Sequence, residues 1–519
     1  MRSGSAPMKL RLTTGGALGW ALMSGTLLAV DARAACEGAT PPRVLSQAEA
    51  REDLELSIAS LEQAFPALDW HHPKRHWQEA TRAARARLSS VEDDFGLYQL
   101  MASLLASLGE DHLTLRLSDA MRCRFRAEAR LFPLDLYWTD QGAYVLRGHG
   151  DAADVPTGAR LLAINGQSWE DLFHEMWLAV GGDGDVATGV MRELDGGGYA
   201  RQRYLLRGAE QRFQVRLHLP DSTLREVALT PVPVAARPPE DDARSPLATL
   251  RWVDEHTALL RVPTFSNRRY REAGTSYPDT LKALFEELEQ RKARDLILDL
   301  RDNGGGSESN ENVLFSYLVE QPFRKYAFVE VRAQHLSVTS TSGQQFEQTV
   351  FEPEELATYR QTRRGTLRRL DLPPLGLKSH WRPVSPVFKG RLVVLVGGRT
   401  YSGAAELASM LYSQGRGLFI GEEVGGTYEG NSSGYSWELT LPNSRMELSV
   451  PLLHFRLNVS GLPRNRGVIP HCVLQPDVRE YGVQEDAVYR LAVDLLHHKW
   501  RTPNSRLCML SGGHGVSAK

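Results

Sequence analysis

The chain has 519 residues, of which 42% are hydrophobic and 24% are charged, a globular composition with room for about three domains. Its formal net charge is −2, and its arginines are interleaved with acidic residues. A nucleic-acid-binding protein usually shows a basic excess or a basic stripe, so composition and charge argue against a nucleic-acid partner.

Residues 1–34 have the layout of a secretory signal peptide: a positive start, an apolar stretch over 17–30, and small residues leading to Ala34. The alternative is a buried first helix. No stretch of the chain reaches the roughly 20 apolar residues of a transmembrane helix, so we expect no stable membrane insertion. We predict an exported protein, periplasmic or secreted. Lipid attachment at Cys36 is disfavoured, because Arg33 stands where an apolar residue is expected.

Four cysteines remain after the expected cleavage, Cys36, Cys123, Cys472 and Cys508. An even number in an exported chain predicts disulfides, and the sequence leaves the pairing open. The most local choice joins Cys36 to Cys123 and Cys472 to Cys508. No CxxC pair is present, so we predict no structural zinc site.

The first part of the mature chain has helical periodicity. Ser46 and Glu49 form a capping-box pattern, and apolar residues at helical spacing continue into further helices, the last of which stops near Gly109. His112 follows, in or just before a short strand. We therefore expect a helical N-terminal domain over residues 35–125.

Short strands dominate the next region, residues 126–235, which we expect to be a β-rich domain. Asn165-Gly166 is a turn signal, and a helix is expected to begin near Trp169. A polar, proline-containing segment over 237–246 is typical of a linker.

Strands and helices alternate over residues 247–500, which predicts an α/β core. Residues 296–300 and 392–396 are short apolar runs of the kind that lie buried in a sheet, and a helix is expected after each. The last residues, 501–519, are small and polar and form a C-terminal tail.

Ser402 stands where the second of these buried runs turns sharply into a helix beginning at Gly403. The first N–H groups of a helix lack intrahelical partners and favour negative charge, so they can hold an oxyanion beside a serine nucleophile. The commonest alternative for a serine in this place is a helix cap.

Gly304, Gly305 and Gly306 follow the other buried run. Without side chains in the way, their N–H groups are exposed, and one of them could be a second oxyanion donor. A flexible turn or a phosphate cradle would look similar, but no Gly-Lys-Ser/Thr follows, which excludes a P-loop.

Three ordered segments resemble the C-terminal processing and tricorn-core family of serine peptidases: Leu-Ile-Leu-Asp-Leu-Arg-Asp-Asn-Gly-Gly-Gly (296–306), Val-Val-Leu-Val-Gly-Gly-Arg-Thr-Tyr-Ser-Gly-Ala-Ala-Glu (393–406) and Ile-Gly-Glu-Glu-Val-Gly-Gly-Thr (420–427). The resemblance implies a serine endopeptidase with a crotonase-like α/β core, acting on a peptide or unfolded protein through an acyl-enzyme. Residues 126–235 would be a PDZ-like module. No metal or organic cofactor is implied.

The family has two catalytic styles. A Ser–Lys dyad is disfavoured here, because Thr427 stands where the lysine would be. The other style takes a histidine from an upstream Asp-His segment, which resembles Asp111-His112. The resemblance then implies Ser402 as nucleophile, His112 as general base, and oxyanion N–H groups from Gly403 and from Gly304 or Gly305.

The third catalytic residue departs from the family pattern. Relatives carry a glutamate where this chain has Arg464, which cannot accept the histidine N–H. Glu429 is the first substitute that we expect, with Asp111, Asn465 and Glu406 as weaker ones. A rival hypothesis follows: a catalytically impaired member that binds peptides or apolar ligands in the cleft. Another is a hydrolase of a small ester or amide.

Overall fold

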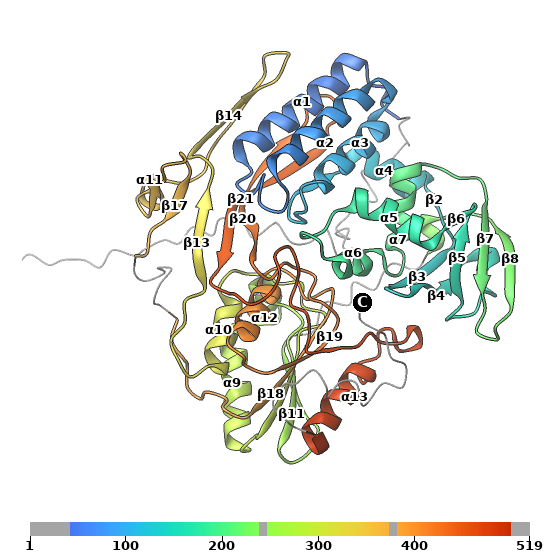
Figure 1. Ribbon diagram of the computed structural model, residues 1–519. Helices are drawn as coiled ribbons and strands as arrows, with labels where there is room; N and C mark the ends of the chain where they lie inside the picture. Colours follow the sequence, from blue (N-terminus) through green and yellow to red (C-terminus); the bar gives the residue numbers. More distant parts are fainter. Residues whose placement is uncertain (1–41, 238–246, 373–380, 500–519) are drawn as a thin grey trace, which may run out of the picture.

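The computed structural model describes residues 42–237, 247–372 and 381–499. The expected signal peptide, most of the expected linker and the C-terminal tail lie outside these ranges. Figure 1 shows a helical region with α1, α2 and α3, a middle region around β3–β8, and an α/β region with β11, β18 and α12. Within the described residues, no helix is both long enough and apolar enough to cross a membrane.

The N-terminal helices begin as the sequence predicts. Ser46 accepts the Glu49 N–H and donates its own N–H to the Glu49 carboxylate, which confirms the capping box. The helices are α1 (Gln47–Ala64), α2 (Lys74–Arg87), α3 (Asp94–Ala106) and α4 (Asp119–Glu128).

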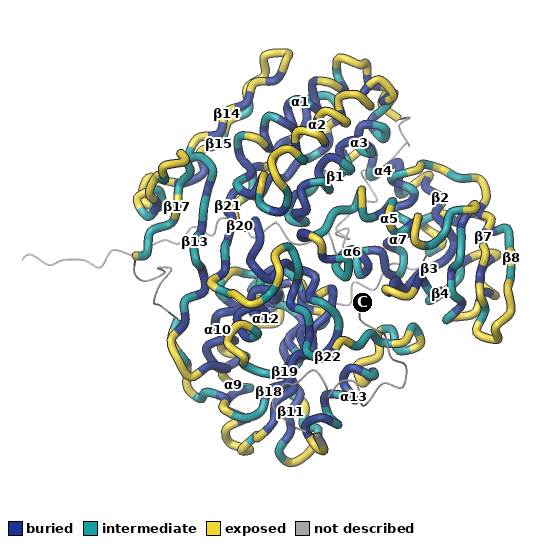
Figure 2. The backbone as a smooth tube through the Cα atoms, in the orientation of Figure 1, coloured by how far each residue is buried: buried dark blue, intermediate teal, exposed yellow. Residues whose placement is uncertain are grey.

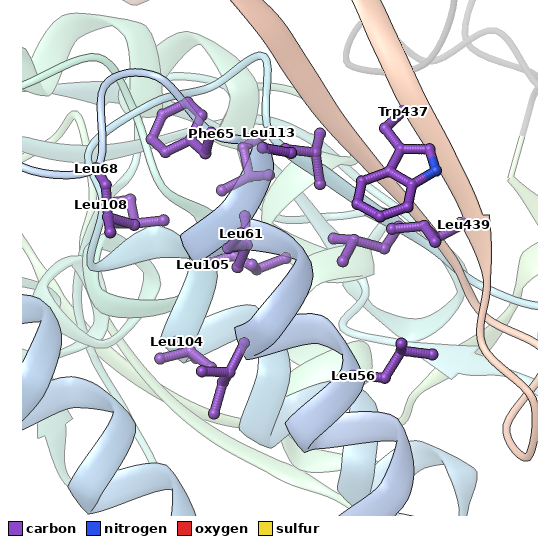
Figure 3. Close-up of a cluster of buried hydrophobic side chains, with 14 of the residues drawn as sticks. Leu56, Leu61, Phe65, Leu68, Leu104, Leu105, Leu108, Leu113, Trp437 and Leu439 are labelled. Carbon is purple, nitrogen blue, oxygen red and sulfur yellow. The ribbon is translucent and has the colours of Figure 1, made fainter. Parts of the chain in front are cut away.

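The helical region shares its hydrophobic core with a hairpin from much later in the chain. Leucines of α1 and α3 pack against Trp437 and Leu439 of β20, as Figure 3 shows. The hairpin consists of β20 (Gly430–Thr440) and β21 (Glu447–Leu457). Burial of this shared core fixes the helices against the β20–β21 hairpin.

Strand β21 organises a sheet that the sequence did not predict. Strand β1 (Thr114–Arg116) pairs antiparallel with β21, with Thr114 opposite Ser449. This pairing begins two residues after His112 and therefore fixes the histidine to the sheet. The remaining strands of this part are β13 (Tyr326–Val331), β16 (Tyr359–Gln361) and β17 (Leu367–Arg369), beside a separate hairpin of β14 (His335–Thr339) and β15 (Gln345–Thr349) and the short helix α11 (Pro353–Leu356).

The middle region is an antiparallel sheet in the order β3-β4-β5-β7-β8, with β6 beside β5 and a small β2–β9 pair. Its strands are β2 (Arg130–Leu131), β3 (Leu134–Thr139), β4 (Gly142–Gly148), β5 (Arg160–Ile164), β6 (Gln167–Ser168), β7 (Phe213–His218), β8 (Leu224–Leu229) and β9 (Val232–Pro233). Helix α5 (Trp169–Val180) begins where we expected. Helices α6 (Ala187–Leu194) and α7 (Gly198–Arg207) were not predicted, and they pack on the sheet through residues such as Leu194 and Tyr199.

The α/β region is a six-stranded sheet, parallel from β11 to β22, with β10 antiparallel at one edge. Its strands are β10 (Thr249–Trp252), β11 (Thr257–Arg261), β12 (Asp295–Asp299), β18 (Arg391–Val396), β19 (Leu418–Gly421) and β22 (Cys472–Val473). Figure 2 shows the central strands β11, β18 and β19 largely buried. Their continuous apolar runs follow from cover on both faces.

Helices cover both faces of this sheet. Leu296 and Leu298 of β12 pack toward one hydrophobic cluster, and Ile297 between them packs toward another. The first cluster includes residues of α9 (Tyr277–Gln290), α10 (Asn310–Leu318) and α12 (Gly403–Ser413), and the short helix α8 (Asn267–Glu272) adds Tyr270; α13 (Ala487–Asp494) packs on the other face. The predicted helices after β12 and β18 are thus present.

Strands β12 and β18 are neighbours, with Asp299 opposite Leu395. Because parallel strands end at one edge of a sheet, the glycine loop 304–306 and Ser402 leave from the same edge. Two motifs about 100 residues apart are brought together by this pairing.

Cys123 and Cys472 are both disulfide-bonded. Cys36 and Cys508 lie outside the described residues, so the pairing given above stays a prediction.

Candidate active site

Ser402 has an unusual backbone conformation between β18 and α12, with φ 49° and ψ −126°. Its side chain makes no capping hydrogen bond, so the structure does not support the helix-cap alternative. Positive φ at a serine is strained and persists only where the surroundings impose it. Here the Tyr401 N–H donates to Asn303 O at 3.0 Å, and Thr400 Oγ1 donates to Leu300 O at 2.9 Å. These bonds tie the turn to the end of β12.

His112 lies beside this serine. Its Nε2 is 3.4 Å from Ser402 Oγ, and its ring stacks on Tyr401 with centroids 5.6 Å apart. The histidine stands between the end of α3 and β1, and both elements are anchored by packing and strand pairing. Ser402 is 290 residues away from His112 in the chain, yet it lies within hydrogen-bonding reach of the imidazole, which can take its proton.

Glu110 is the residue that sequence reasoning missed. Its Oε1 is 3.0 Å from His112 Nδ1, and its Oε2 accepts the Ser432 N–H at 2.9 Å. The side chain is buried. Because both oxygens are engaged, the carboxyl group is fixed in the position from which it can orient the imidazole. The available signal was its place two residues before His112.

The expectation that Glu429 orients His112 is corrected by its contacts. Its carboxylate lies 2.9 Å from Arg456 and 3.6 Å from Arg464, while Glu110 occupies the place at the imidazole. Arg464 also donates to the Trp70 carbonyl at 3.0 Å. Arg464 and Glu429 therefore belong to a separate ion-pair cluster.

The weaker substitutes are engaged elsewhere too. Asn465 Oδ1 lies 3.1 Å from His71 Nδ1. Glu406 lies 2.5 Å from the buried Lys325 and accepts from Asn431. Asp111 lies close to the site, and its N–H donates to Asp183 Oδ1 at 3.1 Å.

Several carboxyl groups around the base are buried, which penalises their charged forms. Burial raises the pKa of Glu110 to about 8. Burial, with repulsion from Glu110, raises the pKa of Asp183 to about 7. Burial raises the pKa of Asp111 to about 6, although the attraction of His112 opposes this rise. The site thus concentrates acids that titrate near neutral pH.

The glycine loop lies against the serine. A Cβ on Gly305, where φ is +97°, would lie 2.8 Å from Ser402 Cβ and 3.1 Å from Gly403 N, so the close approach requires glycine. The Gly305 N–H donates to Asn303 Oδ1 at 2.8 Å and is occupied in this structure. That contact counts against Gly305 as the second oxyanion donor. Gly304 and Gly403 stay as the expected donors.

Glu110, His112 and Asp183 each offer a possible metal ligand, with ligand atoms within 4.8 Å of one another. Both ring nitrogens of His112 already have hydrogen-bonding neighbours, Glu110 and Ser402. The group is therefore better described as a hydrogen-bonded network than as a metal site.

A cleft beside the Gly397-Gly398 turn is lined by arginines and acids, and neither Ser402 nor His112 lines it. The acids neutralise the arginines, so the cleft does not define an anion site. The pairs are Arg192 with Asp195 at 3.3 Å, Arg261 with Asp302 at 2.7 Å, Arg301 with Asp299 at 2.8 Å, and Arg399 with Asp195 at 3.7 Å.

Solved structures share this fold. Mature CPAF matches with a TM-score of 0.61 and 15% identity, covering 88% of this chain and 99% of that one. Mature CPAF complexed with lactacystin matches with a TM-score of 0.60 and 16% identity, covering 87% and 97%. At these identities the likeness shows the fold alone, a mixed α/β fold.

The model of peptidase family S41 matches residues 256–474. This match covers the α/β region and agrees with the resemblance to serine peptidases that the sequence motifs predicted. No curated protein matches the chain in sequence.

Proposed function

We propose that this protein is an exported serine endopeptidase that cleaves peptides or unfolded proteins through an acyl-enzyme. Ser402 is the nucleophile, His112 the general base and Glu110 the acid that orients it. The observation that carries the proposal is the chain of contacts from Ser402 Oγ to His112 Nε2, and from His112 Nδ1 to Glu110 Oε1. The match of residues 256–474 to the model of peptidase family S41 supports the reaction class.

In acylation, Ser402 Oγ attacks the scissile carbonyl carbon as its proton passes to His112 Nε2. The carbonyl oxygen becomes an oxyanion, to which the N–H groups of Gly403 and Gly304 donate hydrogen bonds. The intermediate then expels the amine, which takes the proton from His112. Water attacks the acyl-enzyme in the same way, giving its proton to His112 and releasing the acid with Ser402 restored.

Glu110 takes the role that the family gives to a glutamate at the position of Arg464. When His112 becomes an imidazolium, its Nδ1–H is donated to Glu110 Oε1, and the Ser432 N–H holds the other oxygen in place. The contacts of Glu110 favour turnover over the rival of an impaired, peptide-binding member, because the orienting acid is replaced rather than lost.

The wider architecture of the proposal has a crotonase-like core over residues 247–500, a PDZ-like module over 126–235 and a helical domain over 35–125. The parallel sheet with helices on both faces supports the first assignment, and the antiparallel middle sheet supports the second. The disulfide-bonded Cys123 and Cys472 support export, since disulfides persist in oxidising compartments.

The proposal is tested by incubating the mature protein with a reduced and alkylated, unfolded protein and sequencing the new termini. We expect internal cleavage that Ser402→Ala and His112→Ala both abolish. Retention of the unfolded protein on the folded enzyme without any new termini would favour the binding rival. Cleavage of small esters alone would favour the hydrolase of small molecules.

A further inference from the structure

A side chain from the middle region reaches the catalytic base. Asp183 lies in the segment between α5 and α6 and is 1% exposed. Its Oδ1 accepts the N–H of Asp111, the residue that joins Glu110 to His112, at 3.1 Å. The middle region therefore holds the backbone that carries both the base and its orienting acid.

The segment that carries Asp183 is fixed on both sides. The Gly184 N–H donates to Gly109 O at 2.9 Å, and the Asp185 N–H donates to Asn465 O at 2.8 Å. Gly184 has φ +56°, and a Cβ there would lie 2.7 Å from Asn465 O. The close fit leaves the Asp183 carboxylate little freedom to move.

This carboxylate faces the reacting groups. One of its oxygens lies within 4.8 Å of a His112 ring nitrogen and of a Glu110 carboxylate oxygen. A Cβ added to Gly426 would lie 3.6 Å from Asp183 Oδ2 and also 3.6 Å from Ser402 N. The charged and titratable groups around Asp183 are Glu110, Asp111, His112 and Tyr401. Among these, His112 is the group that can carry a positive charge, while Tyr401 and the Asp111 N–H favour the carboxylate through hydrogen bonds.

We propose that Asp183 is a positioning residue of the active site, whose negative charge stabilises the imidazolium that His112 becomes during acylation. This role rests on the proposed function. Opposite charges a few ångströms apart in a buried site attract more strongly than in water. Relatives carry one orienting acid at the position of Arg464. In this chain two carboxylates, Glu110 and Asp183, take the place of that acid. The rival interpretation is that Asp183 only accepts the Asp111 N–H.

The substitution Asp183→Asn separates the two interpretations, because an asparagine oxygen can still accept the Asp111 N–H but carries no charge. Asp185→Asn is the matched control, since Asp185 lies in the same segment and is exposed. The readout is the rate at which a fluorophosphonate probe labels the full mature chain, measured across pH, beside the thermal unfolding midpoint of each variant.

We expect Asp183→Asn to label roughly 10- to 100-fold more slowly than wild type at neutral pH. The acid limb of its pH–rate profile should move to lower pH, because loss of the charge disfavours the protonated imidazole. Asp185→Asn should match wild type. Asp183→Glu, which keeps the charge, should label faster than Asp183→Asn even if its geometry is imperfect.

A wild-type rate and pH profile in Asp183→Asn would overturn the role of the charge, and so would an Asp183→Glu slower than Asp183→Asn. In both cases a reactive wild-type serine leaves the proposed function standing. A wild-type protein that takes up no probe would instead remove the proposed function and this role with it.

Discussion

At Ser402, particular contacts link backbone strain to the catalytic role that we propose. The positive φ of this serine is imposed by the bonds of Tyr401 and Thr400 to the end of β12. The side chain is thereby released from capping α12 and turned toward His112. A residue whose conformation is over-determined in this way is typical of a functional site.

The first prediction compares two glutamates. Glu110→Gln should slow labelling of Ser402 by up to the order of 10⁴, because the imidazole loses the acid that orients it. Glu429→Gln should leave labelling close to wild type and lower the free energy of unfolding by roughly 1–3 kcal/mol, because Arg456 and Arg464 lose their partner. The measurements are probe kinetics and urea unfolding. The reverse order of the two labelling rates would restore Glu429 as the orienting acid.

The second prediction concerns pH. Burial raises the pKa of Glu110 from 4.5 to about 8, so between these values the folded state holds a proton that the unfolded state has lost. The free energy of unfolding should therefore fall as pH rises through this window, while labelling should rise as Glu110 ionises.

Urea unfolding of wild type and Glu110→Gln at about pH 5 and about pH 8 checks the sign, and the variant should show the smaller decrease. An identical decrease in both proteins would mean that Glu110 is not the source of the pH dependence.

At the scale of elements, sequence patterns predicted α1, β12, β18 and α12 because each is specified locally, by a capping box, an apolar run or a helical period. They did not predict the sheet around β21, whose pairing with β1 joins residues more than 300 positions apart. Glu110 was missed although it lies two residues before His112, because Ser432, which fixes its other carboxylate oxygen, is distant in the chain.

The third prediction tests the segment between α5 and α6. Gly184→Ala should slow labelling, because its Cβ would meet Asn465 O at 2.7 Å and displace Asp183 from the base. Gly166→Ala is the control, with φ +81° and no atom within 4 Å of its Cβ. Both variants carry backbone strain, and the labelling rate should separate them. Equal rates in the two variants would show that close docking of the segment is not needed.

At the scale of the whole molecule, the site is assembled from distant regions. His112 and Glu110 come from the helical region, Ser402 from the α/β region and Asp183 from the middle region. The three ordered family motifs lie in the α/β region, and apart from Asp111-His112 no sequence pattern predicted how the other regions are placed around it. Shared cores, such as that between α1 and β20, determine this placement.

The fourth prediction concerns the disulfides. Denatured, unreduced mature protein should show no free thiol, and peptide mapping should join Cys36 to Cys123 and Cys472 to Cys508. Each bridge is expected to contribute about 2–4 kcal/mol to the free energy of unfolding. Free thiols at Cys123 or Cys472, or a bridge between those two residues, would contradict the pairing.

Fluorophosphonate labelling followed by peptide mass spectrometry tests whether Ser402 is an activated serine. We expect one probe per folded mature chain, attached to Ser402, with labelling lost in Ser402→Ala and in His112→Ala. A correctly folded wild-type chain that takes up no probe would rule out an activated Ser402 and favour a protein that binds peptides without cutting them.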